Sequence, residues 1–306
     1  MQPAPIALFV YNRPWHTLQT LNALKQNALA NQSALFIYAD GPKPGADATD
    51  LQKIADARNI IKCEKWCNEV TIIEAPANRG LAGSIINGVT EILNKYGRVI
   101  VLEDDLVTHP SFLTFMNTNL DIYEKNEKVI SIHGYMYPVK KKISTPFFLK
   151  GADCWGWATW KRGWDMFETD AALLLREIEQ KKLSKEFNFN NTCNYSSLLQ
   201  NQVDNKIDSW AIRWYASAFL AGKLTLYPAK TLVHNIGLDG SGTHKDHAAA
   251  PIKSDFDFVL PEIEEIDAVE NRRSKKAIER FFADQNSFSA RLKSRVQSML
   301  KPFKLA

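Results

Sequence analysis

The sequence predicts an α/β protein with a mostly parallel central sheet flanked by helices. Apolar runs typical of buried strands lie at 6–11, 34–39, 70–73, 99–102 and 129–133. Segments with helical periodicity separate the first four of these runs from the run that follows each. Strands and helices that alternate in this way favour a doubly wound sheet, because each parallel connection needs a crossover.

Helix signals follow the expected strands. Pro14 comes directly after the first strand and suits the first turn of a helix, whose apolar residues recur at three and four over 18–28. Thr49 or Asp50 is expected to cap the next helix. The stretch 78–84 leads into a third helix.

Three adjacent carboxylates, Glu103, Asp104 and Asp105, close the fourth strand. Carboxylates at the end of a buried strand are costly unless a cation or a network of sugar hydroxyls meets them. In open α/β sheets this end of the strand is also where ligands bind. The alternative is a solvated turn before a helix that starts at Pro110, with Asp105 or Thr108 as its cap. Three carboxylates in a row favour a metal or sugar site.

Polar residues also follow the other strands, at Asn12–Arg13, Asp40–Gly41 and Asn78–Arg79. Because the carboxyl ends of parallel strands meet at one edge, we expect these residues to form a single site. An Asn-Arg-Gly turn at a helix start could hold an anion through backbone N–H groups and the guanidinium. No dinucleotide-binding glycine fingerprint or P-loop is present, which disfavours nicotinamide and ATPase functions.

Composition excludes some classes of partner. The chain has 306 residues, 45% of them hydrophobic, and no apolar run approaches the ~20 residues that span a bilayer. The first residues lack the basic and apolar regions of a signal peptide, so we expect a cytoplasmic protein. The net charge of +4 divides into −4 for residues 1–270 (28 basic, 32 acidic) and +8 for 271–306 (10 basic, 2 acidic). An acidic body disfavours nucleic-acid binding.

The second half is rich in tryptophan. Four of the eight tryptophans lie within ten residues. Trp160 and Trp164 are expected in an aromatic core, whereas Trp155 and Trp157 flank Gly156, which suggests that a ligand approaches the backbone at this glycine and that the rings face a sugar.

Three further residues could carry chemistry. Asp208 precedes a helical segment, where either an N-cap or a catalytic carboxylate would stand. His234 and His244 bracket a glycine-rich loop and could reach a metal or a diphosphate.

Four motifs, Phe9–Pro14, Tyr38–Gly41, Asn78–Gly80 and Val101–Leu106, resemble those of inverting nucleotide-sugar glycosyltransferases with the Rossmann-like GT-A fold. Within these enzymes the chain is most similar to bacterial relatives of the N-acetylglucosaminyltransferase that acts on the mannose arms of N-glycans. The resemblance covers roughly residues 4–245.

The resemblance implies a role for each donor residue. Arg13 would contact the diphosphate and Asp40 the uracil edge, while Arg79 would line the nucleotide pocket. Asp104 would meet the ribose or the sugar, and Glu103 would hydrogen-bond the transferred sugar.

It also implies a metal and a base. Asp105 would be the one direct protein ligand of a Mn²⁺ or Mg²⁺ ion that also holds both phosphates. Asp208 resembles the general base of an acidic-then-Trp motif, although Ser209 stands between it and Trp210 where the mammalian enzyme has an acid.

We therefore expect a GT-A domain over 1–245, with a nucleotide-sugar half at 1–135 and an acceptor half at 136–245. Residues 246–306 would form an irregular linker and a basic amphipathic helix, which either packs on the body or docks on an anionic membrane.

The predicted function is transfer of a sugar, such as an N-acetylhexosamine, from a UDP-linked donor to a glycan or lipid-linked acceptor in envelope polysaccharide synthesis. A sugar nucleotidyltransferase and a non-catalytic carbohydrate-binding module are the alternatives.

Overall fold

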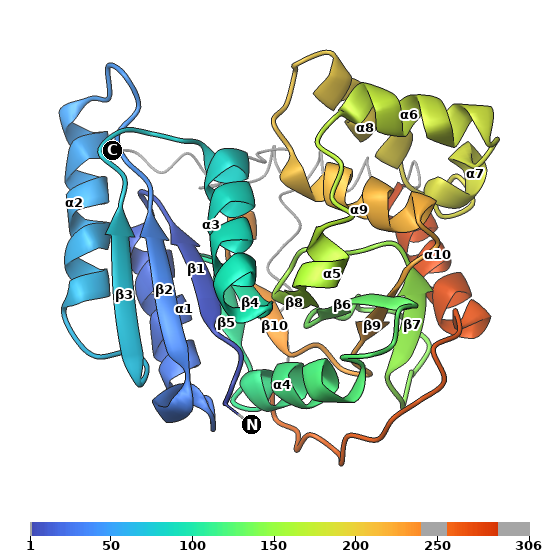
Figure 1. Cartoon of the computed structure of the whole chain (residues 1–306), viewed down its shortest axis with the longest axis horizontal. Coiled ribbons are helices and arrows are strands. Elements are labelled where there is room, and N and C mark those ends of the chain that lie inside the picture. Colours follow the sequence, from blue (N-terminus) through green and yellow to red (C-terminus); the bar gives the residue numbers. More distant parts are fainter. Residues whose placement is uncertain (1, 240–255, 287–306) are drawn as a thin grey trace, which may run out of the picture.

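The computed structural model describes residues 2–239 and 256–286. Its centre is an eight-stranded sheet in the order β3-β2-β1-β4-β8-β6-β9-β7 (Figure 1). The strands of this sheet are β1 (Ile6–Val10), β2 (Ala34–Ala39), β3 (Glu69–Glu74), β4 (Arg98–Glu103), β6 (Val129–His133), β7 (Phe147–Lys150), β8 (Trp157–Trp160) and β9 (Leu224–Tyr227). A separate pair joins β5 (Leu106–Thr108) to β10 (Val233–Asn235).

Most of the sheet is parallel. Strands β3, β2, β1 and β4 pair in parallel, as do β6 and β9. Only β8, between β4 and β6, and β7 at the edge run against the others. The predicted α/β class and the five predicted strands are confirmed, whereas β5, β7, β8 and β10 were not anticipated.

Helices connect the strands. They are α1 (Pro14–Lys25), α2 (Ala48–Lys62), α3 (Leu81–Tyr96), α4 (Phe112–Ile122), α5 (Lys161–Trp164), α6 (Ala171–Gln180), α7 (Ser184–Phe187), α8 (Tyr195–Val203), α9 (Trp210–Leu220) and α10 (Arg272–Asn286), with the 3₁₀ turns η1 (Ala30–Gln32) and η2 (Gly237–Asp239). Pro14 opens α1 as predicted. The cap of α2 is Asp47 rather than Thr49 or Asp50, because the Asp47 carboxylate accepts the N–H of Asp50 at 2.8 Å.

Both faces of the sheet are covered. Along β1, Ile6 and Leu8 belong to the cluster that contains the apolar faces of α1 and α4, whereas Ala7 and Phe9 belong to the cluster that contains α3. Since successive side chains of a strand point to opposite faces, these two clusters lie on the two sides of the sheet. The expectation of a doubly wound sheet is confirmed.

The tryptophans form a core rather than a sugar platform. Trp157 on β8 is fully buried, stacks on Trp210 at 5.4 Å and lies 5.7 Å from both Trp164 and Trp214. The expectation that Trp157 faces a sugar is therefore wrong, because its ring points to the sheet face that α5 and α9 cover. Trp160 and Trp164 are buried, as predicted.

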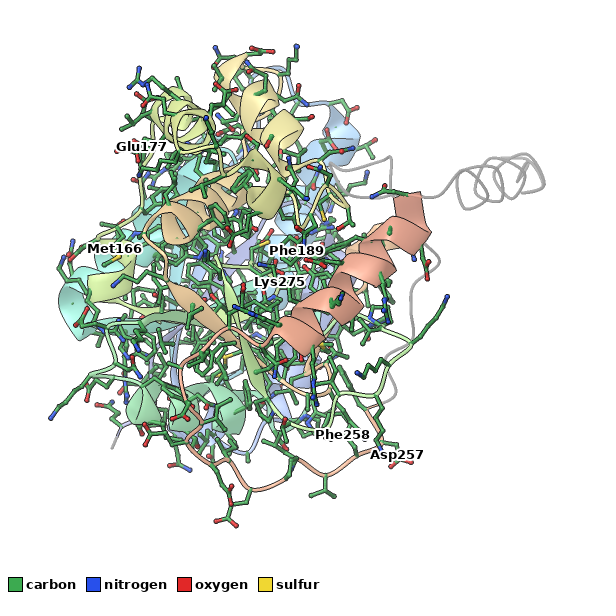
Figure 2. All side chains as sticks on the ribbon, turned by 90° about the vertical axis from the view of Figure 1, so that its right-hand side faces the viewer. Met166, Glu177, Phe189, Asp257, Phe258 and Lys275 are labelled. Carbon is green, nitrogen blue, oxygen red and sulfur yellow. The ribbon has the colours of Figure 1, made fainter. Side chains whose placement is uncertain are left out.

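The last described helix, α10, lies on the outer face of the molecule (Figure 2). Ile278 is buried against the body, and Lys275 pairs with Glu270 at 3.0 Å. The amphipathic segment expected from Phe288 onward lies outside the described residues. Within the described ranges, no helix has the length and apolarity to cross a membrane.

Candidate active site

The acidic triplet lies in a turn between two strands. Glu103 is the last residue of β4, Asp104 and Asp105 form the turn, and β5 begins at the next residue. The alternative of a helix started at Pro110 and capped by Asp105 is not observed, since α4 begins only at Phe112. Pairing of β5 with β10 fixes the turn from the far side.

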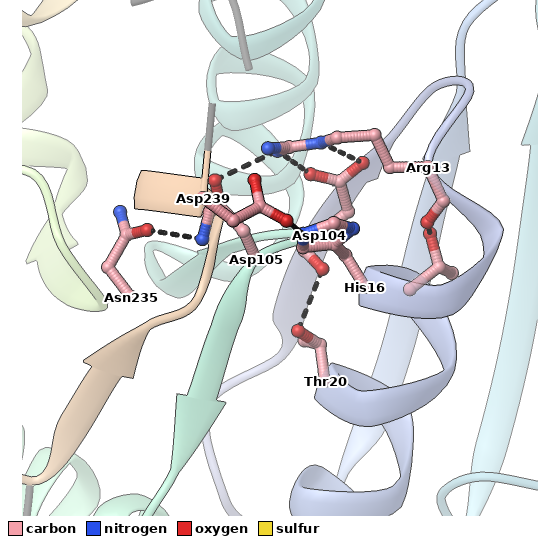
Figure 3. A network of polar contacts seen from close by, with 9 residues as sticks. Arg13, His16, Thr20, Asp104, Asp105, Asn235 and Asp239 are labelled. Carbon is pink, nitrogen blue, oxygen red and sulfur yellow. Dashed lines mark hydrogen bonds and ion pairs between the residues drawn. The ribbon is translucent and has the colours of Figure 1, made fainter. Parts of the chain in front are cut away.

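Arg13 joins two members of the triplet (Figure 3). Its Nε donates to Asp104 Oδ2 at 3.3 Å, and its Nη2 contacts Asp104 Oδ1 and lies 2.9 Å from Asp105 Oδ2. Burial alone would lower the pKa of Arg13, but the two carboxylates raise it above its ordinary value. Sequence reasoning predicted this convergence, because Arg13 follows β1 and the triplet follows its parallel neighbour β4.

Negative charge at this edge exceeds what Arg13 balances. Burial, reinforced by Asp105 and Asp104, raises the pKa of Glu103 to about 8. Burial likewise raises the pKa of Asp104 to about 6, although Arg13 opposes the shift. The Glu103 carboxylate makes no hydrogen bond or ion pair with any residue that the structure describes. Carboxylates crowded in this way are a donor set that suits a hard divalent cation.

The protein groups of the described chain do not form a complete metal site by themselves. Within residues 2–239 and 256–286, no group of three or more His, Cys, Asp or Glu side chains forms a metal cluster. This arrangement fits a cation that takes one protein carboxylate and completes its shell with substrate phosphates and water, as Mg²⁺ commonly does. Asp105, whose side chain is 14% exposed, is the accessible carboxylate of the Arg13 pair.

The loop after β10 packs against Arg13 and Asp105. The backbone N–H of Ile236 donates to the Asp105 carbonyl at 2.9 Å. A Cβ on Gly237 would lie 2.7 Å from Arg13 Nη1 and would overlap the Asp105 carboxylate. A side chain at this position would therefore displace the Asp105 carboxylate and the Arg13 guanidinium from where they meet.

Two further contacts were missed by sequence reasoning. His16 Nε2 lies 3.1 Å from Asp239 Oδ2, so α1 and η2 meet beside the triplet (Figure 3). The hydroxyl of Thr20 donates to the Asp104 carbonyl at 2.9 Å and fixes the turn from below. His16 and Asp239 are 223 positions apart, and no local pattern in the chain predicts such a pairing.

Asp40 organises a separate turn at the end of β2. Its carboxylate accepts four hydrogen bonds of 2.8–3.1 Å, from the backbone N–H groups of Gly41, Arg79 and Gly80 and from the Asn78 side chain. An ionised carboxylate offers about four lone-pair positions, so the chain itself occupies them. Asp40 and Arg79 do meet, as predicted, but through the Arg79 backbone; the Arg79 side chain is exposed.

Asp208 lies apart from the triplet. Its side chain is 67% exposed and pairs with Arg213 Nη2 at 3.0 Å. Ser209 is the N-cap of α9, because its hydroxyl accepts the N–H of Ile212 at 3.3 Å. Capping therefore does not explain Asp208. In the described chain no hydrogen bond or ion pair links it to the triplet, and its role as base stays a prediction.

Trp155 has the exposure expected of a ligand-facing ring. It is half-buried, meets Tyr135 edge-on at 4.7 Å and donates its backbone N–H to His133 Nε2 at 3.2 Å. The expectation that Gly156 lets a ligand approach is wrong, because a Cβ there would lie 2.6 Å from Val233 Cγ2. Packing against β10 requires this glycine.

His234 lies on β10 opposite Val107 and lines a cavity beside Trp155. Burial lowers its pKa, which favours the neutral imidazole that a metal ligand requires. His244 lies outside the described residues. Metal ligation by either histidine stays a prediction.

No protein-family model matches the chain, and no curated protein matches it. It resembles solved structures at low similarity. A fragment of TarS from S. aureus is 11% identical with a TM-score of 0.40, and the match covers 75% of this chain and 59% of that one. For TarS at greater length the match covers 24% of that chain.

Two other solved structures match part of the chain at similarly low similarity. An active-site variant of LgtC is 10% identical with a TM-score of 0.36, covering 72% of this chain and 86% of that one. Glucosyl-3-phosphoglycerate synthase from Mycobacterium tuberculosis, in complex with Mn²⁺, UDP and glucosyl-3-phosphoglycerate, is 10% identical with a TM-score of 0.31, covering 58% and 66%. Similarity of this degree does not assign the chain to a family.

Proposed function

We propose that this chain is a metal-dependent inverting glycosyltransferase of the GT-A fold. It would move a sugar from a UDP-linked donor to a hydroxyl of a glycan or lipid-linked acceptor in cell-envelope polysaccharide synthesis. The observation that carries the proposal is the turn at the end of β4, where two of three adjacent carboxylates pair with Arg13, which follows the neighbouring strand β1. That arrangement suits a diphosphate bridged to a cation.

Donor binding would use both signs of charge at this edge. Asp105 would hold Mn²⁺ or Mg²⁺, and the bound cation would neutralise charge on the departing diphosphate. Arg13, already beside Asp105, would contact the same phosphates. Glu103, whose carboxylate has no partner among the described residues, would accept a hydrogen bond from the transferred sugar.

Proton removal would fall to Asp208. Attack by an acceptor hydroxyl on the anomeric carbon needs a carboxylate within hydrogen-bond reach on the face opposite the leaving group. The carboxylate of Asp208 is exposed, so an acceptor can reach it. Its ion pair with Arg213 would hold it in position.

The remaining parts of the proposal rest on sequence. An N-acetylhexosamine donor rests on the resemblance to N-acetylglucosaminyltransferases, and contact with an anionic membrane rests on the basic segment after Asn286. A cytoplasmic location is also part of the proposal. Flotation with anionic vesicles tests the contact. The full chain is expected to float, whereas a chain ending at Asn286 stays behind, and equal partitioning would remove the idea.

A hydrolysis screen tests the activity. The purified full-length chain is incubated with a panel of nucleotide sugars, with Mn²⁺ or with EDTA, and release of the nucleoside diphosphate is measured. We expect release from a UDP-sugar only with the metal. Release of pyrophosphate from UTP and a sugar 1-phosphate, without hydrolysis of any nucleotide sugar, would instead identify a nucleotidyltransferase.

A further inference from the structure

A second feature lies next to the acidic turn. It is a cavity of about 370 Å³ whose wall includes His234 and Asn235 of β10. The following residue of the chain, Ile236, donates its N–H to Asp105, so this wall adjoins the acidic turn. All the lining residues lie after position 134, so none comes from the part of the chain that carries Arg13, Asp40 and Arg79.

Aromatic rings form one side of the cavity. Tyr135, Tyr137 and Trp155 line it, with ring centroids of 4.7 Å for Tyr135–Trp155 and 5.3 Å for Tyr135–Tyr137. Phe258, in the segment that precedes α10 (Figure 2), also lines it. Pockets lined by aromatic rings with few polar groups are typical of small-molecule sites.

Positive charge also borders the cavity. Lys141, Lys142 and Lys230 border the cavity, and Asp257 is the one acidic residue among its lining residues. No ion pair joins these three lysines to any residue of the described chain, and the Lys230 ammonium lies 4.6 Å above the Phe258 ring. Lys140, outside the cavity, pairs with Asp284. Three such lysines at one cavity of a body with a net charge of −4 form a local field that attracts anions.

From this geometry, and resting on the proposed function, we propose that the cavity binds the acceptor and selects one whose sugar carries a phosphate or a carboxylate. The aromatic wall would take the ring of the sugar, and Lys141, Lys142 and Lys230 would meet its anionic group. The opposite signs of the two regions would then keep donor and acceptor in order. A cation-bridged diphosphate would go to the acidic turn, and a free anion would go to the lysines.

Calorimetry on the full-length chain tests this. Glucose 6-phosphate, glucuronate and the neutral match glucose are titrated at low ionic strength with UDP and Mn²⁺ in excess, so that the acidic edge does not compete. At least one charged sugar is expected to bind about tenfold more tightly than glucose. The sugar that gains identifies the anionic group, and equal affinities for all three would overturn the proposal.

Matched variants assign the effect to the cavity. Lys141→Gln/Lys142→Gln/Lys230→Gln is expected to remove most of the preference for the charged sugar. The control Lys53→Gln/Lys125→Gln/Lys128→Gln changes the same net charge at exposed positions away from the cavity and is expected to keep it. Equal loss in both variants would overturn the proposal.

A third variant and the UDP titration separate the causes. Trp155→Ala is expected to weaken binding of all three sugars alike, since stacking does not depend on the charged group. If UDP binds with Mn²⁺ but no charged sugar exceeds glucose, the cavity assignment fails and the proposed function stands. If charged sugars bind through the lysines but UDP does not bind at all, the cavity binds anionic sugars and the proposed function fails.

Discussion

The acidic turn and the lysine-lined cavity are neighbours that differ in how they are built. The turn is buried and internally bonded, with Asp104 and Asp105 held by Arg13, Thr20 and the loop after β10. The lysines of the cavity are exposed and have no ion-pair partner in the described chain. The contrast indicates that the carboxylates of the turn are already fixed in one geometry. The lysine side chains of the cavity would become ordered only when a ligand binds.

The largest expected effect is at the turn. Asp105→Asn keeps the shape of the side chain but removes the charge that would hold the cation, and stabilisation by such a cation is worth several kcal/mol. Sugar transfer should fall by about 10³-fold. Steady-state kinetics would show this, with Asp165→Asn, an exposed carboxylate paired with Lys161, as the control. Near-wild-type turnover with normal metal dependence would contradict the role of Asp105.

The next largest effect is expected at Asp208, which lies neither in the acidic turn nor at the lysine-lined cavity. Asp208→Asn removes the proposed base and should lower kcat by about 10²-fold, the lower end for general base catalysis. The Asn retains a hydrogen bond to Arg213, so the melting temperature should not change. A loss of only a few-fold in kcat would require another base.

A smaller effect is expected at the second turn of the donor edge. Asp40→Asn presents an amide N–H₂ to backbone N–H donors, which leaves buried groups unsatisfied and should cost about 1–3 kcal/mol of stability. Denaturant unfolding would measure it, with Asp56→Asn on α2 as the control. Equal stability of the two variants would mean that Asp40 does not hold the turn at 78–80.

The smallest effect is at His133, which does not line the cavity but accepts the backbone N–H of Trp155, a lining residue. Burial lowers the pKa of His133 despite the nearby Asp153, so the folded chain keeps this imidazole neutral. Below the ordinary value of 6.5 the unfolded chain takes up a proton that the folded chain does not. The contribution of His133 to the free energy of unfolding is therefore fully present above pH 6.5. It falls as the pH drops below this value, by at most about 1.4 kcal/mol per pH unit.

Unfolding at pH 7.5, 6.5 and 5.5 checks this prediction. His133→Gln can still accept the Trp155 N–H but does not titrate, so its stability should fall less steeply than that of the wild type on the acid side. Parallel pH profiles would show that His133 does not carry the dependence.

The sheet edge that carries Arg13 and the acidic triplet could be predicted from sequence, because each of its strands leaves a local pattern in the chain. Each strand of the first half is an apolar run that ends in polar residues, and parallel topology alone brings Arg13 to Asp104 and Asp105. The alternating pattern also predicted the order of strands and helices in this half correctly, apart from β5. What the pattern could not show is that Asp40 uses its acceptors on its own turn, which depends on side-chain geometry.

The second half resisted prediction because its contacts are long-range. β8 enters the sheet antiparallel to β4, and that pairing turns Trp157 inward, whereas the local Trp-Gly-Trp pattern suggested a ligand surface. The loop at Gly237 meets Asp105 across more than a hundred residues of chain. Neither contact leaves a periodic signal in the sequence.

Calorimetry with UDP, with and without Mn²⁺, tests the central claim most directly. The wild-type chain should bind UDP at least about tenfold more tightly with Mn²⁺ than with EDTA, because Asp105 and the diphosphate would share the cation. Asp105→Asn should bind UDP equally under both conditions. Metal-independent binding by the wild type, or the same metal dependence in Asp105→Asn, would contradict the account.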